Sequence, residues 1–121
     1  MNLEASDLRK RTKAFALRII KLYTTLPKSV EAQVIGKQLL RSGTSVGAHY
    51  AEAYRSRSDA EFISKLEGGL QELEETIYWV ELLVEAEIIP ENRLSELLSE
   101  ANQLISIFVA SVKTVKDKHR K

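Results

Sequence analysis

The apolar residues of this 121-residue chain recur at alternating steps of three and four along almost its whole length. That spacing follows one face of an α-helix, because a helix completes a turn about every 3.6 residues. The pattern is interrupted at three places, and two of these carry the only prolines, Pro27 and Pro90. No segment shows the strict alternation of a β-strand. The spacing therefore predicts four amphipathic helices, which span about residues 5–26, 29–56, 59–87 and 91–116 and are followed by a basic tail at 117–121.

Capping residues mark the predicted helix starts. Ser58 precedes Glu61 by three positions, the capping-box arrangement in which the hydroxyl accepts from the Glu61 amide and the carboxylate reaches back. Ser29 suits the N-cap of the second helix, and Pro90 suits the first turn of the last one, where its missing N–H needs no partner. Because the connections are short, neighbouring helices must run antiparallel. The sequence predicts one all-α domain over residues 1–121, an up-down-up-down four-helix bundle.

One segment of the second helix allows two interpretations. Residues 42–47 (SGTSVG) include two glycines, each of which costs about 1 kcal/mol in a helix relative to Ala. They form either a loop that splits the helix or a continuous helix that another helix can approach closely. We favour close packing, because the apolar period continues through the segment, and we interpret Gly68 and Gly69 in the same way.

Composition excludes several classes of protein. The chain has no Cys, which excludes disulfides, zinc–cysteine sites and thiol chemistry. Basic residues interrupt the first 25 positions, and no apolar run approaches the ~20 residues that a membrane span needs. We expect a cytoplasmic protein with no membrane partner.

Residues suited to catalysis are scarce. His49 precedes Glu52 by three positions, whereas the di-metal sites of helical bundles need Glu-x-x-His on two helices. No serine elbow or Gly-rich phosphate loop is present. The nearest Arg before His49 is Arg41, eight positions away, whereas HEPN-type helical ribonucleases have a shorter Arg-to-His spacing. We expect no catalytic residue, no metal, no cofactor and no enzyme activity, and we interpret His49 as a hydrogen-bonded residue of a helix seam or an interface.

The charge is unevenly distributed, although the net charge is only +1. Residues 1–58 contain eleven basic and four acidic residues, residues 59–100 contain two and twelve, and residues 101–121 contain five and one. The three parts therefore carry +7, −10 and +4. A nearly neutral total conceals a strongly polarised molecule.

Basic residues gather in three stretches that are candidates for binding nucleic acid. Arginines can hold phosphates while the nearby Tyr50 and Tyr54 stack bases. The first and last helices are neighbours in an up-down bundle, so their charges can form one positive face. The alternatives are a solvated helix surface and, near the end of the second helix, arginines paired with Glu52 or with acids on another helix. The candidates are Arg9, Lys10, Arg11, Lys13, Arg55, Arg57, Lys116 and Lys118.

Acidic residues gather on the third helix, where Glu67, Glu74 and Glu81 are spaced seven apart and form one stripe. This helix lies diagonally across the predicted bundle from the basic first helix. Unlike surfaces on one molecule suit a head-to-tail contact that closes into a ring, so we expect a homo-oligomer. Aromatic residues beside the stripe can anchor such a contact. The candidate interface residues are His49, Tyr50, Glu52, Tyr54, Glu74, Tyr78, Trp79 and Glu81.

Much of the sequence resembles a known family. The positions that carry the resemblance are 26–28 (LPK), 38–46 (QLLRSGTSV), Ala51, Glu52, Arg55, Ser58, Glu61, Phe62, Leu66 and 70–75 (LQELEE). In order, spacing and helix pattern, the chain resembles the bacterial four-helix-bundle family of 23S rRNA-intervening sequence proteins over about residues 8–115. One departure lies at residues 49–53, where many relatives have Asn-Ile-Ala-Glu-Gly and this chain has His-Tyr-Ala-Glu-Ala.

The resemblance implies a cyclic homopentamer, a gene sometimes found inside inserts of large ribosomal RNA, and a largely unassigned role. A related branch resembles the accessory proteins of diversity-generating retroelements, five-membered barrels that bind a reverse transcriptase and nucleic acid through basic surfaces. Our first hypothesis is an oligomeric, non-enzymatic protein that binds RNA or DNA. The second is a protein-binding scaffold or accessory subunit, for example of a polymerase such as a reverse transcriptase.

Overall fold

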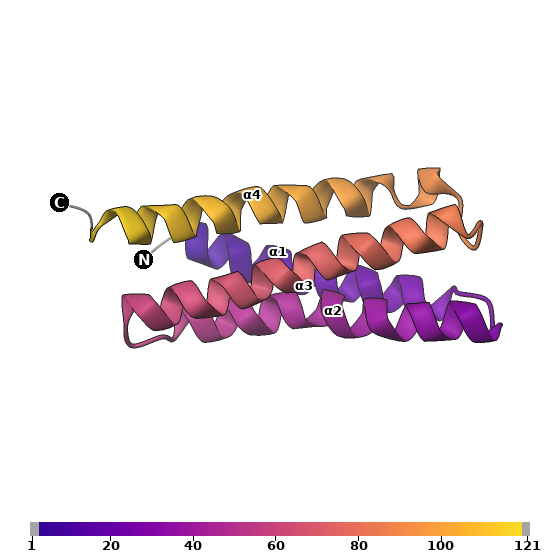
Figure 1. The fold of residues 1–121 in the computed structure, drawn as a ribbon, viewed down its shortest axis with the longest axis horizontal. Helices are drawn as coiled ribbons and strands as arrows, with labels where there is room; N and C mark the ends of the chain where they lie inside the picture. Colours follow the sequence, from indigo (N-terminus) through magenta and orange to yellow (C-terminus); the bar gives the residue numbers. More distant parts are fainter. Residues whose placement is uncertain (1–2, 120–121) are drawn as a thin grey trace.

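The computed structural model describes the backbone of residues 3–119 and the side chains of residues 7–119. Successive helices run antiparallel, and both ends of the chain lie at the same end of the molecule (Figure 1). No strand is present in this part of the chain, which confirms the predicted all-helical fold with four long helices. These are α1 (Leu3–Thr24), α2 (Val30–Tyr54), α3 (Asp59–Glu85) and α4 (Ser95–Asp117), and a short 3₁₀ helix, η1 (Glu91–Arg93), precedes α4.

Two of the three predicted helix starts are confirmed by their caps. The Ser58 hydroxyl accepts a hydrogen bond from the Glu61 amide at 3.1 Å, and the Ser29 hydroxyl accepts one from the Ala32 amide at 3.4 Å. Each cap satisfies one of the amides that the first helical turn leaves without a partner. The connections before α2 and α3 therefore have fixed ends.

The start of the last helix differs from the prediction. Pro90 is extended, with a ψ of 145°, and caps η1 instead of standing in the first turn of α4. The backbone leaves the helical path again at Leu94, whose φ is −113° and whose amide donates to the Glu91 carbonyl at 2.9 Å. Leu94 is buried in the core. Anchoring this side chain decides where the chain turns, and α4 begins only at Ser95.

The helices α2 and α3 have the most extensive contact of any two helices in the bundle. Ser42 and Thr76 are fully buried in it, with their hydroxyl oxygens 2.9 Å apart. Each hydroxyl also bonds to a carbonyl of its own helix, Ser42 to Leu39 and Thr76 to Glu72. Both buried polar groups are therefore satisfied, as the interior requires.

Glycines allow close packing at this seam and also between α1 and α2 and between α3 and α4. Residues 42–47 lie inside the continuous helix α2, as we favoured. A Cβ on Gly43 would lie 2.6 Å from Ile19 Cγ1 of α1. On α3, a Cβ on Gly68 would lie 2.8 Å from two atoms of the His49 ring, and one on Gly69 would lie 2.8 Å from Phe108 Cε2. A side chain at any of these positions would require its neighbour to shift.

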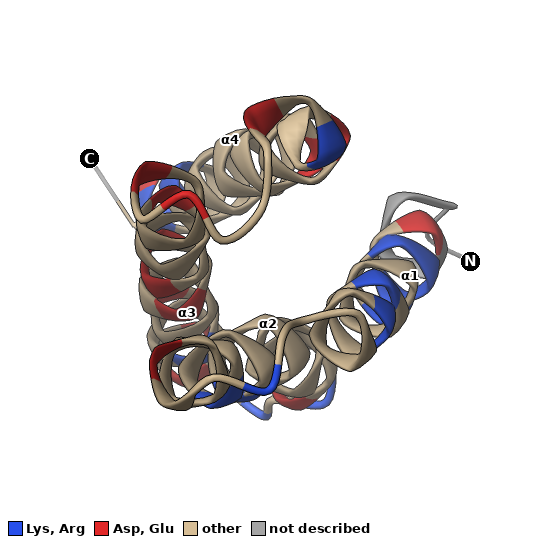
Figure 2. Ribbon diagram, turned by 90° about the vertical axis from the view of Figure 1, so that its right-hand side faces the viewer, with Lys and Arg blue, Asp and Glu red and all other residues tan. Residues whose placement is uncertain are grey.

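The helices α1 and α4 are farther apart than the other neighbouring pairs (Figure 2). Long polar side chains span the distance. Arg11 of α1 donates two hydrogen bonds to the Glu100 carboxylate, at 2.7 and 3.0 Å, and a third to Gln103 at 3.0 Å. The hydrogen bond to Glu100 raises the pKa of Arg11 further above its ordinary value. Arg11 therefore links α1 to α4, as does the longer ion pair between Arg18 and Glu96 at 3.8 Å.

Candidate nucleic-acid interface

A pocket of about 580 Å³ lies between α1 and α2, near the end of the molecule that carries the N-terminus. We call it the basic pocket, because four of its lining residues are Lys or Arg. Three come from the first half of α1, and one is the C-cap of α2. The lining residues are Arg9, Lys10, Thr12, Lys13, Thr44, Gly47, Ala48, Tyr50, Ala51 and Arg55.

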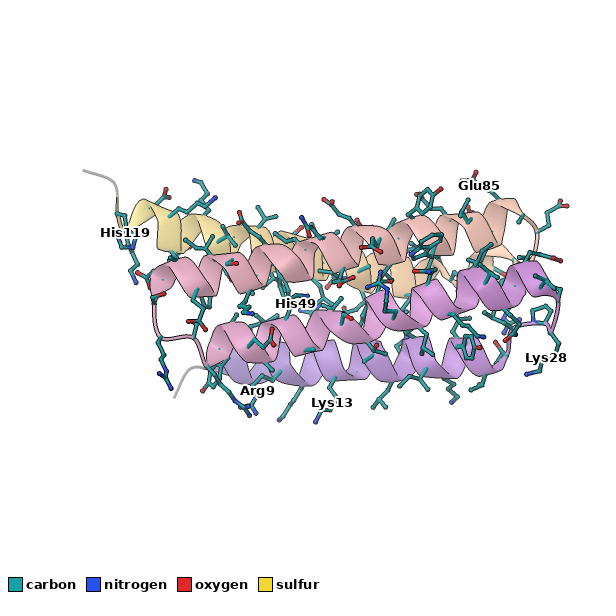
Figure 3. The ribbon with its side chains drawn as sticks, turned by 60° about the horizontal axis from the view of Figure 1, so that its bottom comes forward. Arg9, Lys13, Lys28, His49, Glu85 and His119 are labelled. Carbon is teal, nitrogen blue, oxygen red and sulfur yellow. The ribbon has the colours of Figure 1, made fainter. Side chains whose placement is uncertain are left out.

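The cations of the basic pocket lack acidic partners among the described side chains. Within residues 7–119, no carboxylate forms an ion pair with Arg9, Lys10, Lys13 or Arg55. Helix geometry contributes, because positions four apart share a face of α1. Figure 3 shows Arg9 and Lys13 projecting from the same side of this helix. The negative field of Asp7 acts instead on Arg11, the residue four positions on, whose pKa it helps to raise.

The floor of the pocket consists of small, neutral residues. The two helices meet here at Gly47, where a Cβ would lie only 3.2 Å from Thr12 Oγ1. The hydroxyls of Thr12 and Thr44 donate to carbonyls of their own helices, those of Arg9 and Leu40. A ligand in this pocket would therefore meet a neutral floor with positive charge around it. These floor residues could not be assigned to the site from the sequence, although a Gly in a helical register indicated that another helix approaches α2 closely.

The two tyrosines near the pocket have different environments. Tyr54 is 51% exposed, and the guanidinium carbon of Arg9 lies 5.2 Å from the centre of its ring. Such a cation–π contact orients the arginine. Tyr50 is only 5% exposed and packs against Phe108 in the core, with ring centres 6.0 Å apart. Of the two rings, therefore, Tyr54 is the one placed for stacking or for contact with another molecule.

Arginines at the end of α2 are not paired as one alternative supposed. Glu52 forms its ion pair with Lys65 of α3, at 3.5 Å. Arg57 is exposed, and no carboxylate of the described side chains pairs with it or with Arg55. Both arginines thus remain available to an external anion.

Three other candidate cations are neutralised within the molecule. Arg11 binds Glu100, as described above. Lys116 lies 3.3 Å from a carboxylate oxygen of Glu67, and Lys118 lies 3.4 Å from one of Asp59. The end of α4 is thus tied to α3, and its lysines do not join the α1 charges in one positive face. Residues 120 and 121 of the predicted basic tail lie outside the described residues.

A contact between the chain end and α3 also lowers the pKa of Asp59. His119 Nε2 lies 2.9 Å from Asp59 Oδ2. This hydrogen bond and the neighbouring Lys118 hold the pKa of Asp59 below its ordinary value. The carboxylate therefore stays charged well into the acidic range and keeps its two partners close.

Acidic residues line the outer side of α3, and the basic part of α1 lies across the bundle from them (Figure 2). We call Glu67, Glu74 and Glu81 the acidic face, and all three are exposed. Tyr78 lies among them, 55% exposed, with its ring edge-on to Trp79 at 5.0 Å between centres. Trp79 is partly buried, so Tyr78 is the aromatic residue that this face presents.

His49 lies in the seam between α2 and α3, above Gly68 (Figure 3). Its Nε2 is 3.7 Å from a carboxylate oxygen of Glu72, which also pairs with Arg41. Its Nδ1 is buried without a hydrogen-bond partner in the described structure. Residues 7–119 contain no group of three or more His, Asp or Glu placed to hold a metal ion. His49 lies in a seam as predicted, but the predicted hydrogen bond is not found among the described residues, because Nδ1 has no partner and Nε2 is too far from Glu72.

The comparison with protein families is decisive. The profile of the 23S rRNA-intervening sequence protein matches residues 4–110. The chain belongs to this family. This membership confirms the resemblance seen in the sequence. The match covers the four long helices of this chain except the last turns of α4.

A solved structure supports the same fold. It is the crystal structure of a protein of unknown function from the S23 ribosomal protein family of Bacteroides thetaiotaomicron. It is 34% identical to this chain and superposes with a TM-score of 0.86, over 92% of this chain and 99% of that one. No curated protein matches the chain.

None of the described helices of this chain has the length and apolar character needed to cross a bilayer.

Proposed function

We propose that this protein is a non-enzymatic, oligomeric bundle that binds RNA through the basic pocket and its rim. The observation that carries the proposal is the group of five cations, Arg9, Lys10, Lys13, Arg55 and Arg57, that have no acidic partner among the described residues. Within residues 7–119, exposed cations without an ion pair also occur elsewhere, for example Lys21 and Lys37, but four of these five line one pocket, and this grouping differs from an ordinary solvated surface. The family description names an intervening sequence of 23S rRNA, which favours RNA over DNA.

The physical basis of binding is the release of counterions from phosphates. Each contact made by Lys or Arg contributes about 0.7 to 0.9 to the slope of log affinity against log salt. A single bundle offers at most five such contacts and gives weak, salt-sensitive binding. Joining several bundles in a ring multiplies the contacts and raises the avidity without any new chemistry.

The two charged sides of the molecule support the proposed ring. The acidic face of one copy would meet the outer side of α1 of the next copy, where Leu17 is 60% exposed between Lys10 and Lys21. Tyr78 would supply an aromatic anchor. A head-to-tail contact closes into a ring when its rotation fits a whole number of copies. We propose that it closes here with five copies, and that the protein is cytoplasmic.

RNA binding is tested by removing the cations of the pocket. The variant Arg9→Ala/Lys13→Ala/Arg55→Ala should bind a structured RNA at least about tenfold more weakly at low salt and lower the salt slope by about two. The control variant Lys113→Ala/Lys116→Ala/Lys118→Ala removes the same charge from α4 and should change affinity less than about threefold. Filter binding measures both. Equal losses in the two variants, or no RNA binding by the parent protein at low salt, would reject the proposal.

The second candidate function is a scaffold for a protein partner such as a polymerase. The observation that favours it is a pair of exposed apolar residues at the start of α2, Val30 and Val34, at the end of the molecule away from the basic pocket. A stoichiometric partner that stays bound after nuclease treatment and is lost from Val30→Ser/Val34→Ser would favour this function. RNA binding that needs the basic pocket, with no such partner, would favour the first.

A further inference from the structure

We propose that the basic pocket binds a phosphate monoester, the group found at the end of an RNA strand or on a free nucleotide. The inference rests on the proposed function, because it assigns the ligand of the same surface. It goes further in stating that the pocket distinguishes a terminal phosphate from the phosphates inside a strand.

The first argument is that three of the four pocket cations lie within one short part of α1, residues 9–13. Arg9 and Lys13 are one turn apart, about 6 Å along the axis at ~1.5 Å per residue. Farther along α1, apolar Leu17 and Ile20 are 60% and 43% exposed, and the next exposed cations are Arg18, which pairs with Glu96, and Lys21. The pocket cations therefore form a cluster separate from the other charges of α1. Such a cluster fits a compact anion better than a long backbone.

The second argument concerns shape. A volume of about 580 Å³ lies in the range of about 300 to 1,000 Å³ that is usual for small-molecule sites. Gly47 and Thr12 are in close contact where α1 and α2 meet, so they form a closed floor beneath the pocket. The recess is thus of a size to take one nucleotide, with its phosphate among the cations.

The third argument is the balance of charge. Four cations that line one pocket without a carboxylate repel one another in the free protein. A phosphodiester inside a strand brings one negative charge, whereas a monoester brings about −1.5 to −2 near neutral pH and three acceptor oxygens. Arg9 and Arg55 come from different helices and can offer their planar forks from two sides. The stack of Arg9 on Tyr54 orients one of these forks before the ligand arrives.

The test compares RNAs of one sequence that differ only at their ends, with a 5′-phosphate, a 3′-phosphate or hydroxyls at both ends. Fluorescence anisotropy at low salt should show at least about tenfold tighter binding of one phosphorylated RNA, because charge-assisted hydrogen bonds to its terminal oxygens are gained. That advantage should vanish in Arg9→Gln/Arg55→Gln and persist in Lys116→Gln/Lys118→Gln. Thermal melting checks that both variants remain folded.

Competition separates the two sources of the monoester. If AMP displaces the phosphorylated RNA and adenosine does not, the pocket recognises a free nucleotide as well. If AMP fails while the phosphorylated end retains its advantage, the ligand is the strand end. Equal affinity for phosphorylated and hydroxyl-ended RNA, with binding still dependent on Arg9 and Arg55, would overturn this inference and leave the proposed function standing. Absence of binding to every RNA would instead reject the proposed function, and if AMP does not bind either, the inference falls with it.

Discussion

At the scale of single residues, Gly68 and His49 show how one helix makes room for another. The His49 ring occupies the place where a side chain at position 68 would stand, with Cε1 and Nδ1 2.8 Å from an ideal Cβ. The departure from the family pattern at residues 49–53 thus includes a bulky ring in a tight seam. A small residue on α3 is the condition for placing it there.

We predict that Gly68→Ala destabilises the protein by about 1–2 kcal/mol, because the clash with the ring outweighs the better helix propensity of Ala, which is worth about 1 kcal/mol. The sign should reverse in a His49→Ala background, where the added methyl group meets no ring and only the gain in propensity remains. Urea unfolding of the four proteins measures the cycle. The same destabilisation in both backgrounds would show that the ring is not what excludes a side chain at position 68.

Single residues also set the limit of prediction from sequence. Ser29 and Ser58 act locally, so their caps could be recognised from spacing alone. The turn at Glu87 could not be recognised from the sequence. This residue lies just past α3 with a φ of 60°, a conformation in which Gly is the usual residue. The predicted start of the last helix at Pro90 was wrong for a related reason. Proline suits the first turn of any helix, whereas the burial of Leu94, which affects where α4 begins, depends on distant residues.

At the scale of helices, the sequence specified the elements well and their electrostatic neighbours poorly. The apolar period and the unbroken register through residues 42–47 depend only on nearby positions. Which cations remain unpaired depends instead on contacts between distant segments, such as Arg11 with Glu100, 89 positions apart. The pocket could be predicted only as a group of basic residues, and its neutral floor required the packing of α1 on α2.

The attachment of α1 to α4 gives a prediction at this scale. Replacing Arg11 by Met, which keeps much of the apolar stem, should cost about 1 kcal/mol, because the hydrogen-bonded pair with Glu100 is partly buried. The control Arg18→Met removes a longer, exposed pair with Glu96 at 3.8 Å and should cost less than about 0.5 kcal/mol.

Hydrogen exchange distinguishes a local effect from a global one. In Arg11→Met, amides of α1 should exchange faster, while those of the α2–α3 seam keep their protection. Addition of salt should reduce the difference between Arg11→Met and the parent protein, because salt screens the lost pair. Uniformly faster exchange in all four helices would contradict the view that this pair acts mainly on α1.

At the scale of the whole molecule, the separation of charge gives each side of the bundle a different task. The basic pocket opens between α1 and α2, whereas the acidic face lies on α3, across the bundle. In the proposed ring, Lys10 and Lys21 of α1 meet the acidic face. Lys10 also lines the pocket, whereas Arg9 and Lys13 remain available to an anion. Assembly and anion binding can then coexist on one helix.

Charge reversal tests this division. Glu74→Lys/Glu81→Lys should dissociate the oligomer, because it sets like charges against Lys10 and Lys21 of the next copy, and light scattering should report the monomer mass. Adding Lys10→Glu/Lys21→Glu to the same chain should restore the closed oligomer, since every contact again joins unlike charges. An oligomer that survives the first pair of changes would show that the acidic face is not its interface.

A mixture of two variants also tests the number of copies in the ring. Glu74→Lys/Glu81→Lys has its α3 side reversed, and Lys10→Glu/Lys21→Glu alone has its α1 side reversed, so every favourable contact joins one variant to the other. Alternation can close without a mismatch only in a ring with an even number of copies. A five-membered ring should therefore be restored by the fully reversed chain and not by the equimolar mixture, which should form open or even-membered assemblies. Recovery of the parent mass from the mixture would contradict an odd-numbered ring.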